Sequence, residues 1–304
     1  MKPLIQVLGA TGVGKSQVAC ALAGKFGAEI ISADSVQVYR GFDVGTDKVD
    51  ALRRREIPHH LIDIIDDCSQ FNASQFLELS FHAAEQISAR GRIPLACGGT
   101  ALYLRVMRQG IFAENKNSDT RRQLEEEAAL HGWEALWHEL QVIDPVYAQK
   151  ISPNDKVRLV RALEIHRHCG LSPSAAFRHS RSPFAAYTFV RVGLELDRKK
   201  LYERIDRRVE RMIQKGLVAE VEALLRRHPP SCPPFKALGY KEITAYLRGE
   251  TDLPTALELI QRHSRQFAKR QLSWFRQEKD IQWFDPGDLD AMARHIDACL
   301  TKKP

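Results

Sequence analysis

The sequence of 304 residues has no long apolar run, no low-complexity tract and no paired-cysteine motif. No stretch approaches the roughly 18 consecutive apolar residues that a membrane-spanning helix needs. Residues 1–3 lead directly into a short strand pattern, so we expect no secretory signal, no membrane association and a cytoplasmic location. With 44% hydrophobic and 27% charged residues, the composition excludes a largely disordered chain and favours a globular enzyme.

The cysteines give no sign of pairing or of a metal motif. No two of them form a Cys-x-x-Cys pair, and no Cys/His spacing matches a zinc motif. We therefore expect reduced thiols and no structural zinc. The six cysteines are Cys20, Cys68, Cys97, Cys169, Cys232 and Cys299.

Basic residues exceed acidic residues, and the excess is localised. The formal net charge is +7. Residues 197–227 contain ten Lys/Arg against six Asp/Glu, and residues 262–279 contain six against one. Because these two stretches together exceed the excess of the whole chain, we expect a basic surface for an anionic partner such as a phosphate backbone. A solvated basic surface without a partner is the alternative.

Short apolar runs alternate with amphipathic stretches in the first third of the chain. This alternation is typical of an α/β fold with a mostly parallel sheet flanked by helices. Ligands of such sheets bind at the carboxyl ends of the strands, so the segments 9–16, 33–35 and 98–100, each directly after a predicted strand, should meet in one crevice. The expected strands are residues 4–8, 29–32, 61–65, 93–97, 187–196 and, at an edge, 281–284.

Strand signals disappear between about residues 115 and 181, where the sequence becomes helical and polar. Residues 121–130 and 156–168 are the clearest helices of this stretch. We therefore expect an all-helical insertion domain at 115–185 within an α/β core formed by 1–114 and 186–304. Long amphipathic helices should form the carboxyl-terminal part of this core.

A phosphate-loop motif follows the first predicted strand. Residues 9–16 match G-x-x-x-x-G-K-[ST] between a strand and a helix, which predicts a core of the P-loop NTPase type. Backbone N–H groups, the helix N-terminus and Lys15 would surround phosphate oxygens, and Ser16 would coordinate Mg²⁺. The motif alone leaves an NTPase, a kinase and a transferase with a diphosphate leaving group open. The expected diphosphate-binding residues are Gly9, Ala10, Thr11, Gly12, Val13, Gly14, Lys15 and Ser16.

Asp34 directly follows the second predicted strand, where it should face the phosphate loop across the crevice. A carboxylate there can act as a general base or bind the metal through water. The alternative is a purely structural role, because Asp before Ser often caps a helix or turn.

The ordered motifs of the chain resemble those of the bacterial tRNA dimethylallyltransferase family. The resemblance spans nearly the whole sequence, and although each motif is weak alone, eight in the right order are hard to obtain by chance. The motifs are residues 9–16, 34–40, 45–46, 60–63, 98–103, 158–164, 239–242 and 269–276.

The resemblance implies a reaction. A dimethylallyl group would pass from dimethylallyl diphosphate to N6 of the adenosine at position 37 of a tRNA, beside the anticodon, giving i6A and pyrophosphate. Asp34 resembles the catalytic base of the family, while Lys15, Ser16 and Mg²⁺ would stabilise the leaving group. Arg204, with Arg208 as the alternative, resembles a further diphosphate ligand.

The resemblance also implies a tRNA partner that binds by its anticodon stem-loop with the target base flipped out. For Arg158 and Arg161 the alternative is a solvated helix face with ion pairs to Glu164. Packing of Tyr240, Trp274 and Phe275 in the core competes with stacking on a base. We expect a monomer. The residues that match RNA-contacting positions of the family are Asp34, Ser35, Val36, Gln37, Thr100, Arg122, Gln123, Val157, Arg158, Leu159, Val160, Arg161, Lys269 and Arg270.

Three other functions stay open on the sequence. A small-molecule P-loop kinase would turn over ATP, and the helical insertion would serve as its mobile lid. An adenylate isopentenyltransferase would use the same chemistry on a free nucleotide, with less need for the insertion and the basic carboxyl-terminal helix. A non-catalytic RNA-binding module would use the phosphate loop only to hold backbone phosphate.

Overall fold

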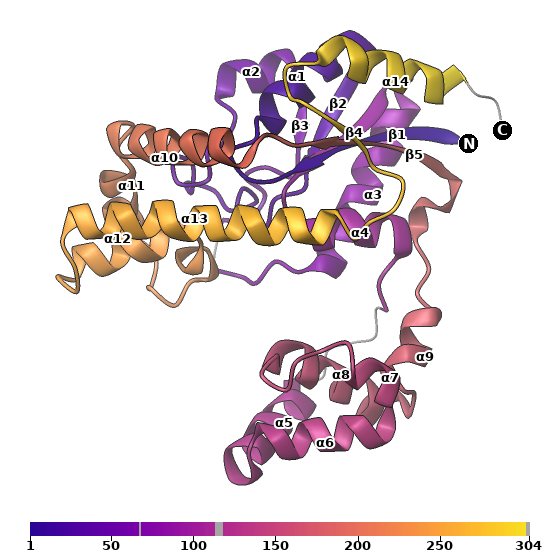
Figure 1. Ribbon diagram of the computed structural model, residues 1–304, viewed down its shortest axis with the longest axis vertical. Helices are drawn as coiled ribbons and strands as arrows, with labels where there is room; N and C mark the ends of the chain where they lie inside the picture. The colour runs from indigo at the N-terminus through magenta and orange to yellow at the C-terminus, as the bar shows by residue number, and fades with distance from the viewer. Residues whose placement is uncertain (67, 113–117, 302–304) are drawn as a thin grey trace. The chain divides into compact units, whose positions relative to one another are not determined.

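The computed structural model describes residues 1–66, 68–112 and 118–301 (Figure 1). The chain forms two compact units, one of Met1–Arg108 with Pro183–Pro304 and one of Gln109–Ser182. The boundary predicted between residues 114 and 115 lies outside the described residues. None of the helices in the described ranges combines the length and the apolar character that crossing a membrane requires.

The first unit is built on a six-stranded sheet in the order β3-β2-β4-β1-β5-β6. Every neighbouring pair is parallel, which confirms the predicted α/β fold. Four apolar residues of the central strand β1, beginning at Leu4, are fully buried because helices cover both faces of the sheet. The strands are β1 (Lys2–Gly9), β2 (Ala28–Ser32), β3 (His59–His60), β4 (Ile93–Gly98), β5 (Tyr187–Leu194) and β6 (Gln282–Phe284).

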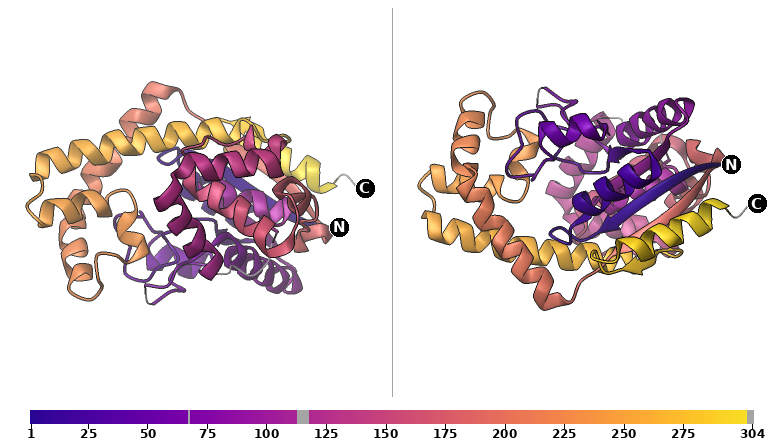
Figure 2. Two further views of the ribbon diagram at one scale, coloured as in Figure 1. Left: turned by 90° about the horizontal axis from the view of Figure 1, so that it is seen from below. Right: turned by 90° about the horizontal axis from the view of Figure 1, so that it is seen from above.

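Helices on the two faces of this sheet form separate layers. α1 and α14 lie on the same face, as the view from above shows, where they pack on Ile5 and Val7 of β1 (Figure 2). α3 and α4 cover the opposite face, where the buried Gln6 donates to the carbonyl of Leu104. The helices of this unit are α1 (Lys15–Phe26), α2 (Ala51–Glu56), α3 (Ala73–Ala89), α4 (Ala101–Gln109), α10 (Arg198–Gln214), α11 (Leu217–Leu225), α12 (Tyr240–Leu247), α13 (Leu253–Phe275) and α14 (Leu289–Thr301).

The strand predicted at residues 61–65 is wrong. Leu61 and Asp63 have φ values of 62° and 57°, a left-handed conformation that ends β3 after two residues. The segment then turns onto the loop that follows β2, where the N–H groups of Ile64 and Ile65 both donate to the carbonyl of Val38. The apolar pattern therefore marks a buried loop rather than a strand.

The expectation of six reduced thiols is also wrong. Cys68 and Cys232 form a disulfide with their Cα atoms 4.9 Å apart, and the other four cysteines are not part of a disulfide. The two residues are 164 positions apart, so no local spacing announces the pair. They lie in a second apolar cluster, in which Phe42 and Phe235 pack against α11 and α12.

The second unit is helical throughout its described residues. Its core is formed chiefly by α5, α6 and α8, with Leu124, Leu140 and Leu163 fully buried. The carboxylate of the buried Asp144 accepts hydrogen bonds from the N–H groups of Tyr147 and Ser174, which joins α7 to α9. The helices are α5 (Ser118–His131), α6 (Trp133–Ile143), α7 (Pro145–Ala148), α8 (Lys156–Cys169) and α9 (Pro173–Arg178).

Candidate active site

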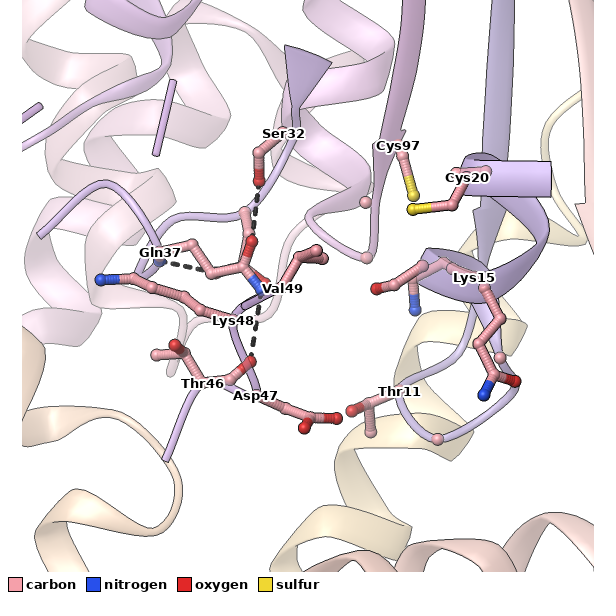
Figure 3. A pocket seen from close by; sticks show the side chains of 18 of the residues that line it. Thr11, Lys15, Cys20, Ser32, Gln37, Thr46, Asp47, Lys48, Val49 and Cys97 are labelled. Atoms are coloured by element: carbon pink, nitrogen blue, oxygen red, sulfur yellow. Dashed lines mark hydrogen bonds between the residues drawn. The ribbon is translucent and has the colours of Figure 1, made fainter. Parts of the chain in front are cut away.

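A cavity of about 750 Å³ opens at the carboxyl ends of β1, β2 and β4, within the first unit. The phosphate loop forms one side, and residues from Gln37 to Arg53 form the other (Figure 3). Asp34, Gly98 and Gly99 also line it. The three segments predicted to meet in one crevice therefore do so.

The phosphate loop is held open by glycines. Gly12 and Gly14 have φ values of 79° and 108°, which side-chain-bearing residues rarely adopt. A Cβ on Gly12 would also lie 2.8 Å from the side chain of Ile205 on α10. Gly14 is the N-cap of α1 and offers no side chain to the first helical N–H groups, which are therefore left for an anion.

Lys15 lies in the cavity with its Nζ donating to the carbonyl of Ala10 over 2.7 Å. Burial lowers the pKa of Lys15 to about 8, with a smaller opposing effect from the nearby Asp34. An anion beside Lys15 would reverse that shift, because it stabilises the charged ammonium. The hydroxyl-bearing Ser16 is exposed in the first turn of α1 and offers an oxygen of the kind that Mg²⁺ prefers.

Both candidate arginines of α10 reach the phosphate loop. Arg204 donates to the carbonyl of Val13 over 3.1 Å. Arg208 donates to the hydroxyl of Thr11, and its Nε lies 3.2 Å from a carboxylate oxygen of Asp47. Both guanidinium groups therefore lie at the rim of the loop.

The cationic face of α10 continues beyond these two residues. The helix begins at an N-cap, Asp197, and buries Leu201, Ile205 and Val209, so the residues between them point outward. Spacings of three or four residues then bring the basic side chains to one face, which lines the cavity. These residues are Arg204, Arg207, Arg208, Arg211 and Lys215. The sequence predicts that this stretch is basic, but only the positions of its buried apolar residues show which basic side chains face the cavity.

Asp34 uses one carboxylate oxygen as a turn cap, which is the structural role that the sequence left open. Its Oδ1 accepts from the N–H groups of Val36 at 2.8 Å and Gln37 at 3.2 Å, so the carboxylate caps the turn after β2. Its Oδ2 has no hydrogen bond within the part of the chain that the structure describes. The carboxylate therefore enters the cavity with one oxygen fixed and one oxygen available.

Neighbours of Asp34 are joined to one another. The Thr100 hydroxyl accepts from the N–H of Ser35 at 3.3 Å. Gln37 lines the cavity, where its side chain accepts from Ser32 and donates to the carbonyl of Thr46. Thr100, Ser35 and Val36 adjoin the cavity wall through these contacts.

Gln271 connects two sides of the site, and no sequence signal singles it out within the basic carboxyl-terminal helix. This α13 residue is only 6% exposed. Its Oε1 accepts from the Thr11 N–H at 2.8 Å, and its Nε2 donates to the Gly99 carbonyl at 2.7 Å. One amide thus joins the phosphate loop to the turn after β4.

The remaining RNA candidates lie outside the cavity. Lys269 and Arg270 are exposed on α13 of the first unit. In the second unit Arg122 and Gln123 are exposed on α5, and Arg122 lies near Asp119 and Glu126.

The segment 157–161 in the second unit divides by exposure. Val157 is 71% exposed, and Arg158 forms an ion pair with Asp155. Arg161 lies 3.4 Å from Glu164, as the ion-pair alternative predicted. Leu159 and Val160 are buried at 0% and 2%, so the prediction that they meet RNA needs correction. Their side chains pack in the helical core and cannot reach a ligand.

The aromatic candidates mostly pack in the protein. Tyr240 and Phe275 are fully buried, and the Tyr240 hydroxyl donates to Glu220 over 2.7 Å. The half-buried Trp274 lies beneath the Arg105 guanidinium, 3.7 Å from its ring centroid. For Tyr240 and Phe275, core packing is therefore the correct alternative.

A parallel sheet with a glycine-rich phosphate loop after its first strand, a lysine in that loop and a cationic cavity above it defines a phosphate-loop enzyme. The comparisons with known proteins identify the family within that class. A family model described as IPP transferase matches residues 37–278, and one described as isopentenyl transferase matches residues 3–57. The chain belongs to the IPP transferase family.

Relatives of this chain carry the name tRNA dimethylallyltransferase. The protein of Desulforudis audaxviator is 42% identical over 285 residues, which cover 93% of this chain and 92% of the relative. That of Geobacter metallireducens is 42% identical over 292 residues, which cover 95% and 94%.

Solved structures agree in fold. The tRNA isopentenylpyrophosphate transferase of Bacillus halodurans matches 98% of this chain and 96% of its own with a TM-score of 0.72 and 38% identity. A eukaryotic dimethylallyltransferase described as acting on tRNA matches all of this chain and 81% of its own, with a TM-score of 0.84 and 29% identity.

Proposed function

We propose that the protein transfers a dimethylallyl group from dimethylallyl diphosphate to N6 of the adenosine at tRNA position 37, forming i6A and releasing pyrophosphate. One observation carries the proposal: the Asp34 carboxylate and the Lys15 ammonium line the same cavity at the carboxyl edge of the sheet. A base and an anion site at one cavity suit a reaction that removes a proton from one substrate and a diphosphate from the other.

The phosphate loop would hold the diphosphate. The N–H groups at the start of α1, with Lys15, Arg204 and Arg208, would bind its oxygens and stabilise the charge that develops as the allylic C–O bond breaks. Mg²⁺ bound through the Ser16 hydroxyl would neutralise part of the same charge. In the unliganded protein these side chains contact backbone and hydroxyl oxygens of the loop, which diphosphate oxygens would replace.

Asp34 would take the proton. The adenine amine is a poor nucleophile because its lone pair is delocalised into the ring, so it must lose a proton as its nitrogen bonds to C1 of the dimethylallyl group. The electron pair of the C1–O bond leaves with pyrophosphate, and the proton passes to Asp34 Oδ2. Since Oδ1 is held by two backbone N–H groups, the carboxylate has a fixed direction.

RNA would be bound at several places. The target adenine would lie beside Ser35, Val36, Gln37 and Thr100. The exposed Lys269 and Arg270 would supply positive charge for the RNA phosphates. The helical unit would add Arg122, Gln123, Val157, Arg158 and Arg161, with Leu159 and Val160 holding α8 in its core. We propose that the anticodon stem-loop is the bound element and that the protein acts as a monomer in the cytoplasm.

The test is a single incubation with Mg²⁺, labelled dimethylallyl diphosphate, an anticodon stem-loop, AMP and ATP. Label in the stem-loop at the adenosine next to the anticodon supports the proposal. Label in AMP alone would indicate an adenylate isopentenyltransferase, and ATP turnover without label transfer would indicate a kinase. RNA binding with no turnover of either substrate would indicate a binding module.

A further inference from the structure

The disulfide between Cys68 and Cys232 plays no part in the proposed reaction, yet it lies close to a third reactive group. The Nδ1 atom of His228 is 3.7 Å from Cys68 Sγ. The ligand atoms of all three residues lie within 4.8 Å of one another. Cys232 is 2% exposed, whereas Cys68 is only partly buried. A reagent from solvent therefore reaches the Cys68 sulfur more readily.

On the Cys68 side, the disulfide is attached to the loop that contains residues 63–65, which contact the wall of the cavity. Residues 63–65 donate backbone hydrogen bonds to the carbonyls of Gln37 and Val38, and Arg40 N–H donates back to Ile65. One residue beyond Cys68, the Ser69 carbonyl accepts from the Tyr39 hydroxyl over 2.8 Å. Hydrogen bonds therefore join this loop to the segment after Asp34.

On the Cys232 side, the bond reaches the connection between α11 and α12. The N–H of Cys232 donates to the Pro229 carbonyl, and its own carbonyl accepts from Phe235. The ring of Phe235 lies 5.3 Å from that of Phe42, which continues the same wall. The disulfide thus adds a covalent link beside the apolar packing of Phe42 and Phe235.

We propose that Cys68, Cys232 and His228 form a reversible thiol–disulfide site that couples the wall segment 37–40 to the α11–α12 connection. In a cytoplasmic protein such a bond forms and opens with the thiol redox state rather than serving as a permanent crosslink. Any consequence for catalysis rests on the proposed function, whereas the redox chemistry itself does not.

The chemistry balances with glutathione as the partner. A glutathione thiolate attacks Cys68 Sγ, the S–S bond breaks, and Cys232 leaves as a thiolate that takes a proton. A second glutathione thiolate attacks the glutathione sulfur of the mixed disulfide, which releases glutathione disulfide and Cys68 thiolate. Two electrons pass from two thiols to the protein. On closing, Cys68 is the thiol that attacks glutathione disulfide, and His228 Nδ1, 3.7 Å from its sulfur, lies where it can take the proton of that thiol.

The test is equilibration of the full-length protein with glutathione buffers of varied ratio, followed by acid quenching, alkylation and peptide mapping. We expect a single transition between a 68–232 crosslinked peptide and two alkylated cysteines, with four and six titratable thiols at the two ends. By hydrogen exchange, amides of residues 37–40 and 63–65 should exchange about tenfold faster in the reduced form, because local opening no longer works against a crosslink.

Variants separate this site from ordinary thiol chemistry. Cys232→Ser should remove the transition and give the fast-exchange pattern in every buffer. Cys299→Ser should change neither, although Cys299 Sγ lies 3.8 Å from His295 Nε2, a contact similar to that of Cys68. His228→Asn should slow closing at pH 7 about threefold, because asparagine cannot take the proton of the Cys68 thiol.

Four results would overturn the proposal. The first is that both thiols stay alkylatable in every buffer, and the second is that the bond stays closed in every buffer. The third is that the reduced protein binds one equivalent of Zn²⁺ and then resists oxidation, which would make the three residues a metal site. Unchanged hydrogen exchange across a clean redox transition would contradict the coupling to the wall.

Discussion

The two sides of the cavity are built in different ways. The phosphate side is one short stretch, residues 9–16, whose glycines and helix N-terminus shape it locally. The opposite side, here called the acceptor wall, comprises residues 37–53 and contains no helix or strand except the start of α2. Long-range contacts hold that wall, including Glu220, which accepts from the N–H groups of residues 43–45. In the proposed reaction the leaving group would thus meet a local motif, whereas the acceptor would meet a surface that depends on the whole fold.

Lys48 shows how the acceptor wall is held. Its side chain is 3% exposed and forms ion pairs with Asp43 at 2.7 Å and Asp63 at 2.6 Å. Arg54 pairs with the other oxygen of Asp63 at 2.7 Å, so the pKa of Asp63 stays below its usual range although burial opposes this. This cluster joins the wall to the segment after β3.

Removing charge from the phosphate side should have a large effect. Lys15→Met should lower kcat/KM for dimethylallyl diphosphate about 10²–10³-fold, since it removes a charge aimed at the leaving group. Steady-state kinetics with the stem-loop in excess measures this. Thermal and urea stability should stay near wild type, and a large loss of stability would show that Lys15 is structural.

A substitution in the acceptor wall should lower the stability of the protein rather than its affinity for the diphosphate. Lys48→Met removes a buried cation from the largely buried Asp63, which keeps only its ion pair with Arg54, so the free energy of unfolding should fall by about 1–3 kcal/mol. The Kd for dimethylallyl diphosphate should change little. Urea denaturation provides the measurement, and Arg226→Met is the matched control because its ion pair with Glu222 is exposed, at 73% and 53%. A loss confined to diphosphate binding would contradict the division between the two sides.

Gln271 tests the link between the phosphate loop and β4. Gln271→Glu keeps the acceptor for Thr11 but sets a carboxylate oxygen against the Gly99 carbonyl, so the Kd for the diphosphate should rise about tenfold. Gln271→Met loses both hydrogen bonds but adds no repulsion. Its Kd should therefore rise by about half as much on a logarithmic scale, which is about threefold. Titration calorimetry distinguishes them, and equal effects would mean that only side-chain volume matters.

The pH dependence of binding should give the smallest effect. In the free protein Lys15 has a pKa of about 8, and the bound anion raises it, so affinity is full below that value and falls as the pH rises through it. Between pH 8 and 9 the affinity should fall about five-fold. Lys15→Arg stays charged and should show a flat profile. A wild-type profile that is equally flat would mean that Lys15 remains charged in the free protein.

The difference between the two sides also explains which features could be predicted from the sequence. The phosphate loop and the parallel strands are local patterns, so residues 9–16 and strands β1, β2, β4 and β5 follow from periodicity and motif. The loop at residues 61–65 was mistaken for a strand because its apolar residues face a buried surface in a left-handed turn. Gln271, Lys48 and the pairing of Cys68 with Cys232 depend on contacts between distant segments, and no local pattern carries them.

The most direct measurement compares single-turnover prenylation and equilibrium diphosphate binding for Asp34→Asn. The asparagine keeps an oxygen for the N–H groups of Val36 and Gln37 but cannot act as the base. The prenylation rate on a stem-loop should fall about 10²–10⁴-fold while the Kd for dimethylallyl diphosphate stays within about twofold of wild type. An unchanged rate would show that Asp34 is only a turn cap, and the proposed separation of base and leaving-group sites would be wrong.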